Sequence, residues 1–124
     1  VSAAKLLDQA LIGTGFPYDR RERPEYYLAF VAAVLRRAQG VRRAGTASLD
    51  LCYVACGRLD GFWELKLKPW DIAAGALILA EAGGRASLWS GDQLDLWAQE
   101  IVASNGHIHQ ELAALLRNCA SSAG

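Results

Sequence analysis

The chain has 124 residues and a formal net charge of zero; 52% of its residues are hydrophobic and 21% are charged. This length fits one domain with one hydrophobic core and leaves little room for a second. A net charge of zero provides no overall field that would gather nucleic acid or anionic lipid. No apolar run reaches the ~20 residues that a membrane span needs, so the composition predicts a globular domain with no membrane partner.

Basic residues are concentrated in the first part of the chain. Seven arginines are found between positions 20 and 43: Arg20, Arg21, Arg23, Arg36, Arg37, Arg42 and Arg43. They can form solvated helix and loop surfaces, or a surface that binds a protein partner. A groove for single-stranded nucleic acid is disfavoured, because no stacking aromatic residues alternate with the arginines.

The three cysteines carry no motif for a metal site or a disulfide. Cys52 and Cys56 are four residues apart in a predicted helix, and Cys119 follows much later. Free cysteine in such a helix behaves as a small buried apolar residue. This usage predicts a reducing, cytoplasmic setting.

The first half of the chain predicts a strand, a helix, a strand and a second helix. Residues 10–13 are a short apolar run ended by glycine and proline, typical of a buried strand. In 24–38 apolar side chains recur every 3.6 residues or so, and two arginines occupy the last turn, which predicts a helix. A strand is predicted over 41–44. Residues 45–48 then lead into a buried helix of small and apolar residues that continues to Cys56.

The second half adds three strands and two helices. Residues 58–64 alternate, with Trp63 on one side of the predicted sheet and Phe62 and Glu64 on the other. The remaining elements are a helix over 70–82, strands over 85–89 and 101–104, and a helix over 107–118. This order predicts a single α/β domain: a mixed, mostly parallel sheet of about five strands with helices on both faces.

Two histidines open the last predicted helix. His107 and His109 are two residues apart, so their side chains are expected on different faces of the helix. Surface or capping roles are therefore favoured over metal ligation.

Asp71 stands at the opening of the helix over 70–82. It can cap this helix, because the unpaired N–H groups and the positive end of the helix dipole favour a carboxylate. It can also ligate Mg²⁺, which commonly takes one or two protein carboxylates and keeps several waters. The helix is rich in alanine and glycine, which allows another element to approach closely.

Four segments resemble the inositol monophosphatase family. Residues 70–84 (WDIAAGALILAEAGG) resemble its second signature, and the order along the chain is the family's order. The other similar segments are 13–17 (GTGFP), 42–51 (RRAGTASLDL) and 53–64 (YVACGRLDGFWE). The resemblance covers nearly the whole chain, is strongest to bacterial members, and implies the C-terminal half of the sugar-phosphatase fold.

The resemblance implies roles for five residues. Asp71 would ligate the catalytic Mg²⁺. Glu64 would accept hydrogen bonds from inositol hydroxyls, since an ionised carboxylate can take two such donors; a solvated charge at a strand end is the alternative. Gly45, Thr46 and Ala47 would line the substrate pocket.

The family's remaining metal ligands do not occur in the sequence. The family draws a glutamate pair and an Asp-Pro-x-Asp-Gly-Thr segment from its N-terminal half. Residues 1–124 are therefore expected to be the C-terminal domain without that metal-binding half, and to be inactive alone. The implied reaction is hydrolysis of inositol monophosphate by metal-activated water. If this chain alone proves active, Asp50 and Glu81 are the next carboxylates to test.

Two other functions stay open. The same fold can act on another sugar phosphate or a nucleotide bisphosphate. Alternatively, the chain is a non-catalytic interaction module, as in relatives associated with the transcription machinery, with the arginines of 20–43 as the contact surface. The resemblance further implies a homodimer, for which helix 24–38 offers an apolar face, or pairing with a complementing N-terminal half.

Overall fold

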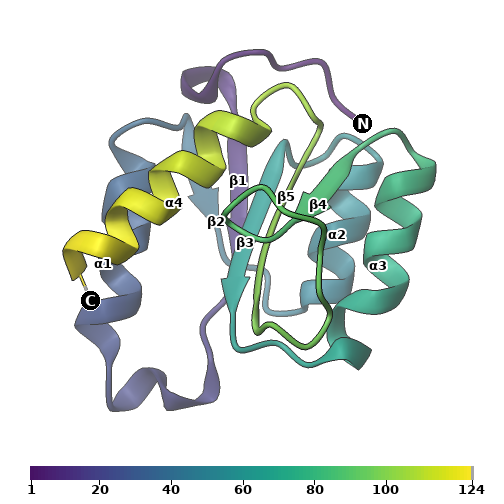
Figure 1. Cartoon of the computed structure of the whole chain (residues 1–124). Helices are drawn as coiled ribbons and strands as arrows, with labels where there is room; N and C mark the ends of the chain where they lie inside the picture. Colours follow the sequence, from purple (N-terminus) through teal and green to yellow (C-terminus); the bar gives the residue numbers. More distant parts are fainter. Residues whose placement is uncertain (124) are drawn as a thin grey trace.

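Five strands form one mixed sheet in the computed structural model, which describes residues 1–123 (Figure 1). The order across the sheet is β2-β1-β3-β5-β4. β1 pairs in parallel with β2 and β3, whereas β5 pairs antiparallel with β3 and β4. The strands are β1 Leu11–Thr14, β2 Gly40–Arg42, β3 Gly61–Leu65, β4 Arg85–Ser87 and β5 Glu100–Ser104.

The predicted mixed sheet of about five strands is confirmed, but it is not mostly parallel. Two of the four strand pairs are antiparallel, and both involve β5. Residues 88–99 connect β4 to β5 without a helix. A parallel pair needs a long crossover connection, which is usually helical. β5 therefore returns directly and inserts antiparallel between β3 and β4.

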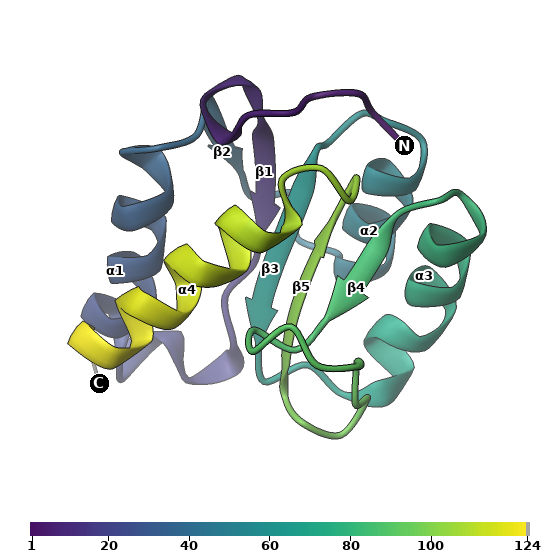
Figure 2. The same ribbon diagram turned by 45° about the horizontal axis from the view of Figure 1, so that its top comes forward.

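Helices cover both faces of the sheet, as predicted. α1 and α4 pack together on one face, and α2 and α3 pack together on the other (Figures 1 and 2). Two short 3-10 helices precede α1. The helices are η1 Leu7–Gln9, η2 Tyr18–Arg21, α1 Pro24–Leu35, α2 Ala47–Ala55, α3 Pro69–Glu81 and α4 His109–Ala123.

Two helices differ most from the prediction: α1 ends three residues earlier than expected, and α4 is shifted, ending five residues later than expected. α4 begins at His109, two residues later than expected, because the Asn105 side chain organises the turn before it. The Asn105 Oδ1 atom accepts hydrogen bonds from the backbone N–H groups of His107 at 2.9 Å and Ile108 at 3.3 Å. An asparagine side chain that bonds to the backbone in this way favours a turn over a helix.

The sheet separates two hydrophobic cores, and β3 contributes to both. Trp63 packs with Phe30 and Leu112 on the side of α1 and α4. Phe62 packs with Leu51 on the side of α2 and α3. Successive side chains of a strand point to opposite faces of the sheet. The predicted alternation of β3 is thus confirmed, with both faces buried.

α2 and α3 approach closely at Gly75. A Cβ atom on Gly75 would lie 2.7 Å from the Cβ of Leu51, a distance that side chains do not tolerate. Gly75 therefore serves helix packing, because it lets the middle of α3 lie close against the middle of α2. Both helix starts belong to the cleft described below.

Two further predictions from composition can be compared with the structure. Within residues 1–123, no helix combines the length and the apolar character that a membrane span requires. All three cysteines are free, but Cys56 is exposed rather than buried, while Cys52 and Cys119 are half-buried.

Candidate substrate and metal site

A cleft of about 390 Å³ lies beyond the carboxyl ends of β1 and β3. Its walls come from the segment after β1, the start of α2, and the connection from β3 to α3. Because β1 and β3 are parallel, their carboxyl ends meet at one edge of the sheet, the usual place for ligands in α/β proteins. The five residues predicted from the sequence all line this cleft: Gly45, Thr46, Ala47, Glu64 and Asp71.

Gly45 turns the chain into α2. Its φ angle is +101°, in the left-handed region that favours glycine. The Arg43 guanidinium folds against it, since a Cβ on Gly45 would lie 2.8 Å from Arg43 Nη1. Thr46 and Ala47 follow as the cap and first residue of α2. The first N–H groups of a helix have no acceptor inside the helix, so this wall offers backbone donors to a ligand.

Asp71 is the third residue of α3, and it combines the two roles considered from the sequence. Its Oδ2 atom accepts a hydrogen bond from the Lys68 N–H at 2.9 Å, which caps the helix. Within residues 1–123, its Oδ1 atom accepts no hydrogen bond. One carboxylate oxygen is thus committed to the helix, and the other is available at the cleft.

Glu64 is a buried carboxylate that faces the cleft without a protein partner in the described part of the chain. Its side chain sits at the end of β3, and the residue is only 8% exposed. Burial raises the pKa of Glu64 to about 7; the negative charges of Asp50 and Asp71 add to this, and Arg43 opposes it. Gly15 makes room for this carboxylate, because a Cβ there would lie 2.3 Å from Glu64 Oε1.

Asp50 is a second buried carboxylate, near Glu64 but not among the residues that line the cleft, and the sequence alone did not predict its burial there. It belongs to α2, is 1% exposed, and neither of its carboxylate oxygens has a hydrogen-bond partner among residues 1–123. Burial raises its pKa to about 6, opposed by Arg43. A carboxylate in a helix with almost no polar face was the signal available in the sequence. Glu81, in contrast, is exposed at the far end of α3 and does not line the cleft.

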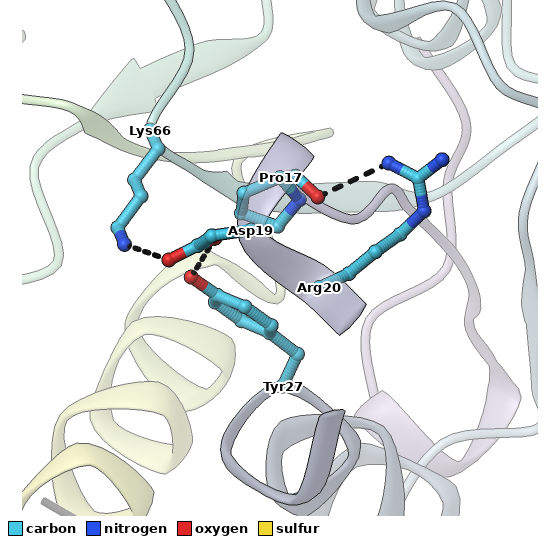
Figure 3. Close-up of polar contacts among 5 residues, drawn as sticks. All are labelled: Pro17, Asp19, Arg20, Tyr27 and Lys66. Carbon is cyan, nitrogen blue, oxygen red and sulfur yellow. Dashed lines mark hydrogen bonds and ion pairs between the residues drawn. The ribbon is translucent and has the colours of Figure 1, made fainter. Parts of the chain in front are cut away.

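One wall of the cleft is fastened by Asp19 (Figure 3). Lys66 Nζ donates to Asp19 Oδ2 at 2.5 Å, and the Tyr27 hydroxyl donates to Asp19 Oδ1 at 2.6 Å. Lys66 has a left-handed φ of 60°, rare for a residue with a side chain, and its N–H donates to Gln99 O at 2.7 Å. These contacts join η2 to the end of β3.

His109 lies outside the cleft, and the prediction of a surface or capping role for it is wrong. The side chain is 1% exposed, with Nε2 2.7 Å from Ser87 Oγ and Nδ1 2.8 Å from Ser104 Oγ. Ser87 Oγ already donates to Leu88 O, so the network assigns the ring proton to Nε2. Burial, with a smaller effect of Arg85, lowers the pKa of His109 to about 4. His107 is exposed, as expected.

The carboxylate oxygens in the cleft fit part of a Mg²⁺ site. Within residues 1–123, no three histidine, cysteine, aspartate or glutamate side chains are grouped to hold a metal ion. Asp71 nevertheless provides an available carboxylate oxygen, the hard ligand type that Mg²⁺ prefers. Mg²⁺ commonly binds through one or two carboxylates with several waters, so Asp71 can serve as one ligand but does not complete a site.

The sequence profile of the inositol monophosphatase family matches residues 1–121. The chain belongs to this family. It is 47% identical over 116 residues to the inositol-1-monophosphatase of Synechocystis sp., a match that covers 94% of this chain and 40% of that protein. It is 48% identical over 107 residues to the Nus factor SuhB of Pseudomonas aeruginosa, covering 85% of this chain and 40% of that one.

A solved family structure has the same fold. The inositol monophosphatase from Anabaena (Nostoc) sp. PCC 7120 superposes with a TM-score of 0.91 at 44% sequence identity. The match covers 95% of this chain and 47% of the Anabaena chain. This chain therefore spans less than half the length of the inositol monophosphatase relatives it matches.

Proposed function

We propose that this chain provides the polyol-binding wall and one metal-ligating carboxylate of a Mg²⁺-dependent inositol-1-phosphate phosphatase. The observation that carries the proposal is the convergence of two carboxylates on one cleft. Asp71 has an available oxygen there, and Glu64 is buried without a hydrogen-bond partner in residues 1–123. Family membership supports the phosphatase reaction, and the named relatives support inositol monophosphate as the substrate.

Each residue has a distinct task in this proposal. Glu64 binds hydroxyl groups of the inositol ring; with a pKa of about 7 it is partly protonated near neutral pH and can both donate and accept. Thr46 and the start of α2 add a hydroxyl and backbone N–H donors. Asp71 would hold Mg²⁺, which when bound would supply an activated water and stabilise the leaving oxygen.

We further infer that the 124-residue polypeptide is a C-terminal domain and releases little or no phosphate by itself. Asp71 is one carboxylate, and a cation held by one carboxylate and waters binds weakly. The rest of the metal site is expected from an N-terminal half in the full-length protein that carries this chain. Purified polypeptide of 124 residues should therefore show no Mg²⁺-dependent phosphate release from inositol 1-phosphate.

The test is Mg²⁺-dependent phosphate release by the full-length protein and its Asp71→Asn variant. Asparagine retains the shape of the side chain but not its charge, so we expect kcat/KM to fall at least ~100-fold through loss of metal binding. Glu81→Gln removes a carboxylate from the other end of α3 and serves as the control. Equal loss in both variants, or full activity of Asp71→Asn, would contradict the proposal.

A second function is favoured by the names of several relatives. Proteins called Nus factor SuhB are among those that match this chain. Arg36 and Arg42 are exposed and lie outside the cleft, so they could contact a protein of the transcription machinery. Arg36→Glu/Arg42→Glu in the full-length protein should then abolish co-purification with transcription complexes. If the Arg36→Glu/Arg42→Glu variant retains every such contact, this second function is contradicted.

We also infer a cytoplasmic homodimer. Three free cysteines suit a reducing compartment. Leu28 and Leu35 are each 53% exposed on α1, and an apolar helix face of this kind suits contact with a second copy. Light scattering of the full-length protein should show a dimer that Leu28→Asp converts to a monomer. A wild-type monomer would exclude the dimer.

A further inference from the structure

The segment between β1 and α1, residues 15–21, forms one wall of the cleft and is joined to the rest of the protein by few hydrogen bonds. Five of its residues line the cleft: Gly15, Phe16, Pro17, Tyr18 and Arg20. Among residues 1–123, most hydrogen bonds of residues 16–22 connect residues 17–23 to one another. The exceptions are made by the Asp19 carboxylate, which reaches α1 and the end of β3.

Both oxygens of the Asp19 carboxylate accept hydrogen bonds from outside the segment (Figure 3). Oδ2 accepts from Lys66 Nζ at 2.5 Å, and Oδ1 accepts from the Tyr27 hydroxyl at 2.6 Å. The hydrogen bond from Lys66, followed by that from Tyr27, lowers the pKa of Asp19, so the carboxylate is ionised at neutral pH. Hydrogen bonds to an ionised acceptor are stronger than neutral ones. Asp19, Tyr27 and Lys66 are called the Asp19 network below.

Lys66 makes this contact from an unfavourable backbone conformation. The β3–β5 ladder ends at the pair Leu65 and Glu100, and the next residue on each side is left-handed, with φ of 60° at Lys66 and 63° at Gln99. Such angles at residues other than glycine persist where the surrounding structure fixes them, and they are frequent at functional sites. Glycine would fit this backbone better. The contribution of lysine at position 66 is therefore its side chain, which binds Asp19.

The segment held by Asp19 begins directly beside Glu64. A Cβ atom on Gly15 would lie 2.3 Å from Glu64 Oε1. Glu64 and Lys66 are two residues apart at the end of β3, so the same strand end carries the buried carboxylate and the cation that holds the segment. A shift of the segment therefore changes the space around the carboxylate to which the proposed function assigns the inositol hydroxyls.

We propose that Asp19 is a positioning residue: through Lys66 and Tyr27 it holds segment 15–21 in place and thereby fixes the shape of the cleft beside Glu64. This inference rests on the proposed phosphatase function. Asp19 and Tyr27 lie outside the cleft, so Asp19 acts on the substrate only through the segment. Within residues 1–123 the network forms no hydrogen bond with Asp71, so its loss should affect substrate binding rather than the metal-dependent step.

Amide hydrogen exchange of the full-length protein, followed by mass spectrometry, tests whether Asp19 holds the segment. In Asp19→Ala the peptide that covers residues 15–23 should exchange at least ~10-fold faster than in wild type, because local opening becomes easier. The side chains of Lys66 and Asp19 are 42% and 33% exposed, so the overall fold should persist. Arg37→Met is the matched control, because it removes the exposed salt bridge with Glu111 and should leave exchange in residues 15–23 unchanged.

Steady-state kinetics with inositol 1-phosphate tests whether the segment shapes the cleft. In Asp19→Ala we expect KM to rise about tenfold and kcat to change by less than ~2-fold, because binding geometry is lost while Asp71 remains. Lys66→Gly gives a result that a merely structural role would not produce. Glycine adopts a φ of 60° without strain, so the melting temperature should stay close to that of wild type while KM rises as in Asp19→Ala.

A double variant separates positioning from direct contact with the substrate, because Lys66 itself lines the cleft. If Lys66 acts only through Asp19, the KM of Asp19→Ala/Lys66→Gly should equal that of Asp19→Ala within ~2-fold, since both changes break the same interaction. If the Lys66 ammonium binds the substrate directly, the two increases in KM should multiply.

Three results would overturn the inference. These are unchanged exchange of residues 15–23 in Asp19→Ala, faster exchange together with a normal KM, and multiplied increases in KM in the double variant. Failure of the proposed function is seen separately. In that case the full-length wild type would release no phosphate from inositol 1-phosphate, while hydrogen exchange would still show whether Asp19 holds the segment.

Discussion

Two buried titratable clusters differ in how completely their polar atoms are bonded. His109 has a hydroxyl partner on each ring nitrogen, supplied by Ser87 and Ser104. Asp50 has no partner for either oxygen within residues 1–123, and the neighbouring Glu64 has none either. Buried polar groups in folded proteins are nearly always hydrogen-bonded, and exceptions call for an explanation.

The two clusters have different roles in this chain. Burial shifts the pKa of His109 and of both carboxylates toward the neutral form. At His109 the neutral form is fully bonded, so the cluster stabilises the junction of β4, β5 and α4. At the cleft Glu64 lacks a hydrogen-bond partner within residues 1–123, so folding leaves an acceptor that a polyol, a cation or water can satisfy, whereas Asp50 does not line the cleft. Stability therefore resides in the first cluster and binding in the second.

The largest expected effect is the loss of His109. His109→Ala removes two hydrogen bonds, leaves the hydroxyls of Ser87 and Ser104 without their partner, and creates a cavity. We expect a loss of about 3–4 kcal/mol in the free energy of unfolding, measured by urea denaturation. His107→Ala, at an exposed position two residues away, should change it by less than about 0.5 kcal/mol. Similar effects in both variants would show that His109 is not a structural centre.

The second-largest expected effect is the pH dependence of stability that His109 causes. Its folded pKa of about 4 lies below the ordinary value of 6.5, so between these values the unfolded chain binds more protons. Stability from this group is complete above pH 6.5 and is lost as the pH falls toward 4, by up to about 3 kcal/mol. The free-energy difference between wild type and His109→Gln should shrink over this range. A constant difference would mean that His109 titrates normally.

Asp50 should show the opposite sign. Its folded pKa of about 6 exceeds the ordinary 3.8, so the folded chain binds more protons between these values, and stability falls as the pH rises through them. Asp50→Asn removes this loss, and we expect its stability relative to wild type to improve by about 2 kcal/mol from pH 4 to pH 8. Glu81→Gln, an exposed carboxylate, is the control. If the stability of Asp50→Asn relative to wild type does not rise with pH, Asp50 must have a hydrogen-bond or ionic partner in the folded protein.

The smallest effect concerns the space beside Glu64. Gly15→Ala places a methyl group where the Glu64 carboxylate lies, so the flexible side chain must shift. In the full-length protein, KM for inositol 1-phosphate should rise about tenfold, with little change in melting temperature. Gly40→Ala, whose added Cβ would make an ordinary 3.4 Å contact with Leu11, should leave KM unchanged. A normal KM in Gly15→Ala would show that Glu64 does not contribute to substrate binding.

Local pattern predicts most of this fold, since strands and helices were expected close to their observed positions. The antiparallel insertion of β5 depends on a connection without a helix, which periodicity does not report. The convergence of Glu64 and Asp71 follows from their places at element ends, and the family signature supports it. Asp19 and Lys66 are 47 residues apart, and His109 meets Ser87 22 residues away, so only the tertiary structure brings these partners together.

Paramagnetic broadening of the amide NMR signals of this chain by Mn²⁺ tests the contrast between the clusters most directly. Mn²⁺ favours the same oxygen ligands as Mg²⁺ and broadens nearby signals even when it binds weakly. We expect selective broadening at Asp71, Thr46 and Glu64, its loss in Asp71→Asn, and unaffected signals at Ser104 and His109. Broadening centred on the His109 cluster, or a cleft response that survives Asp71→Asn, would contradict this expectation.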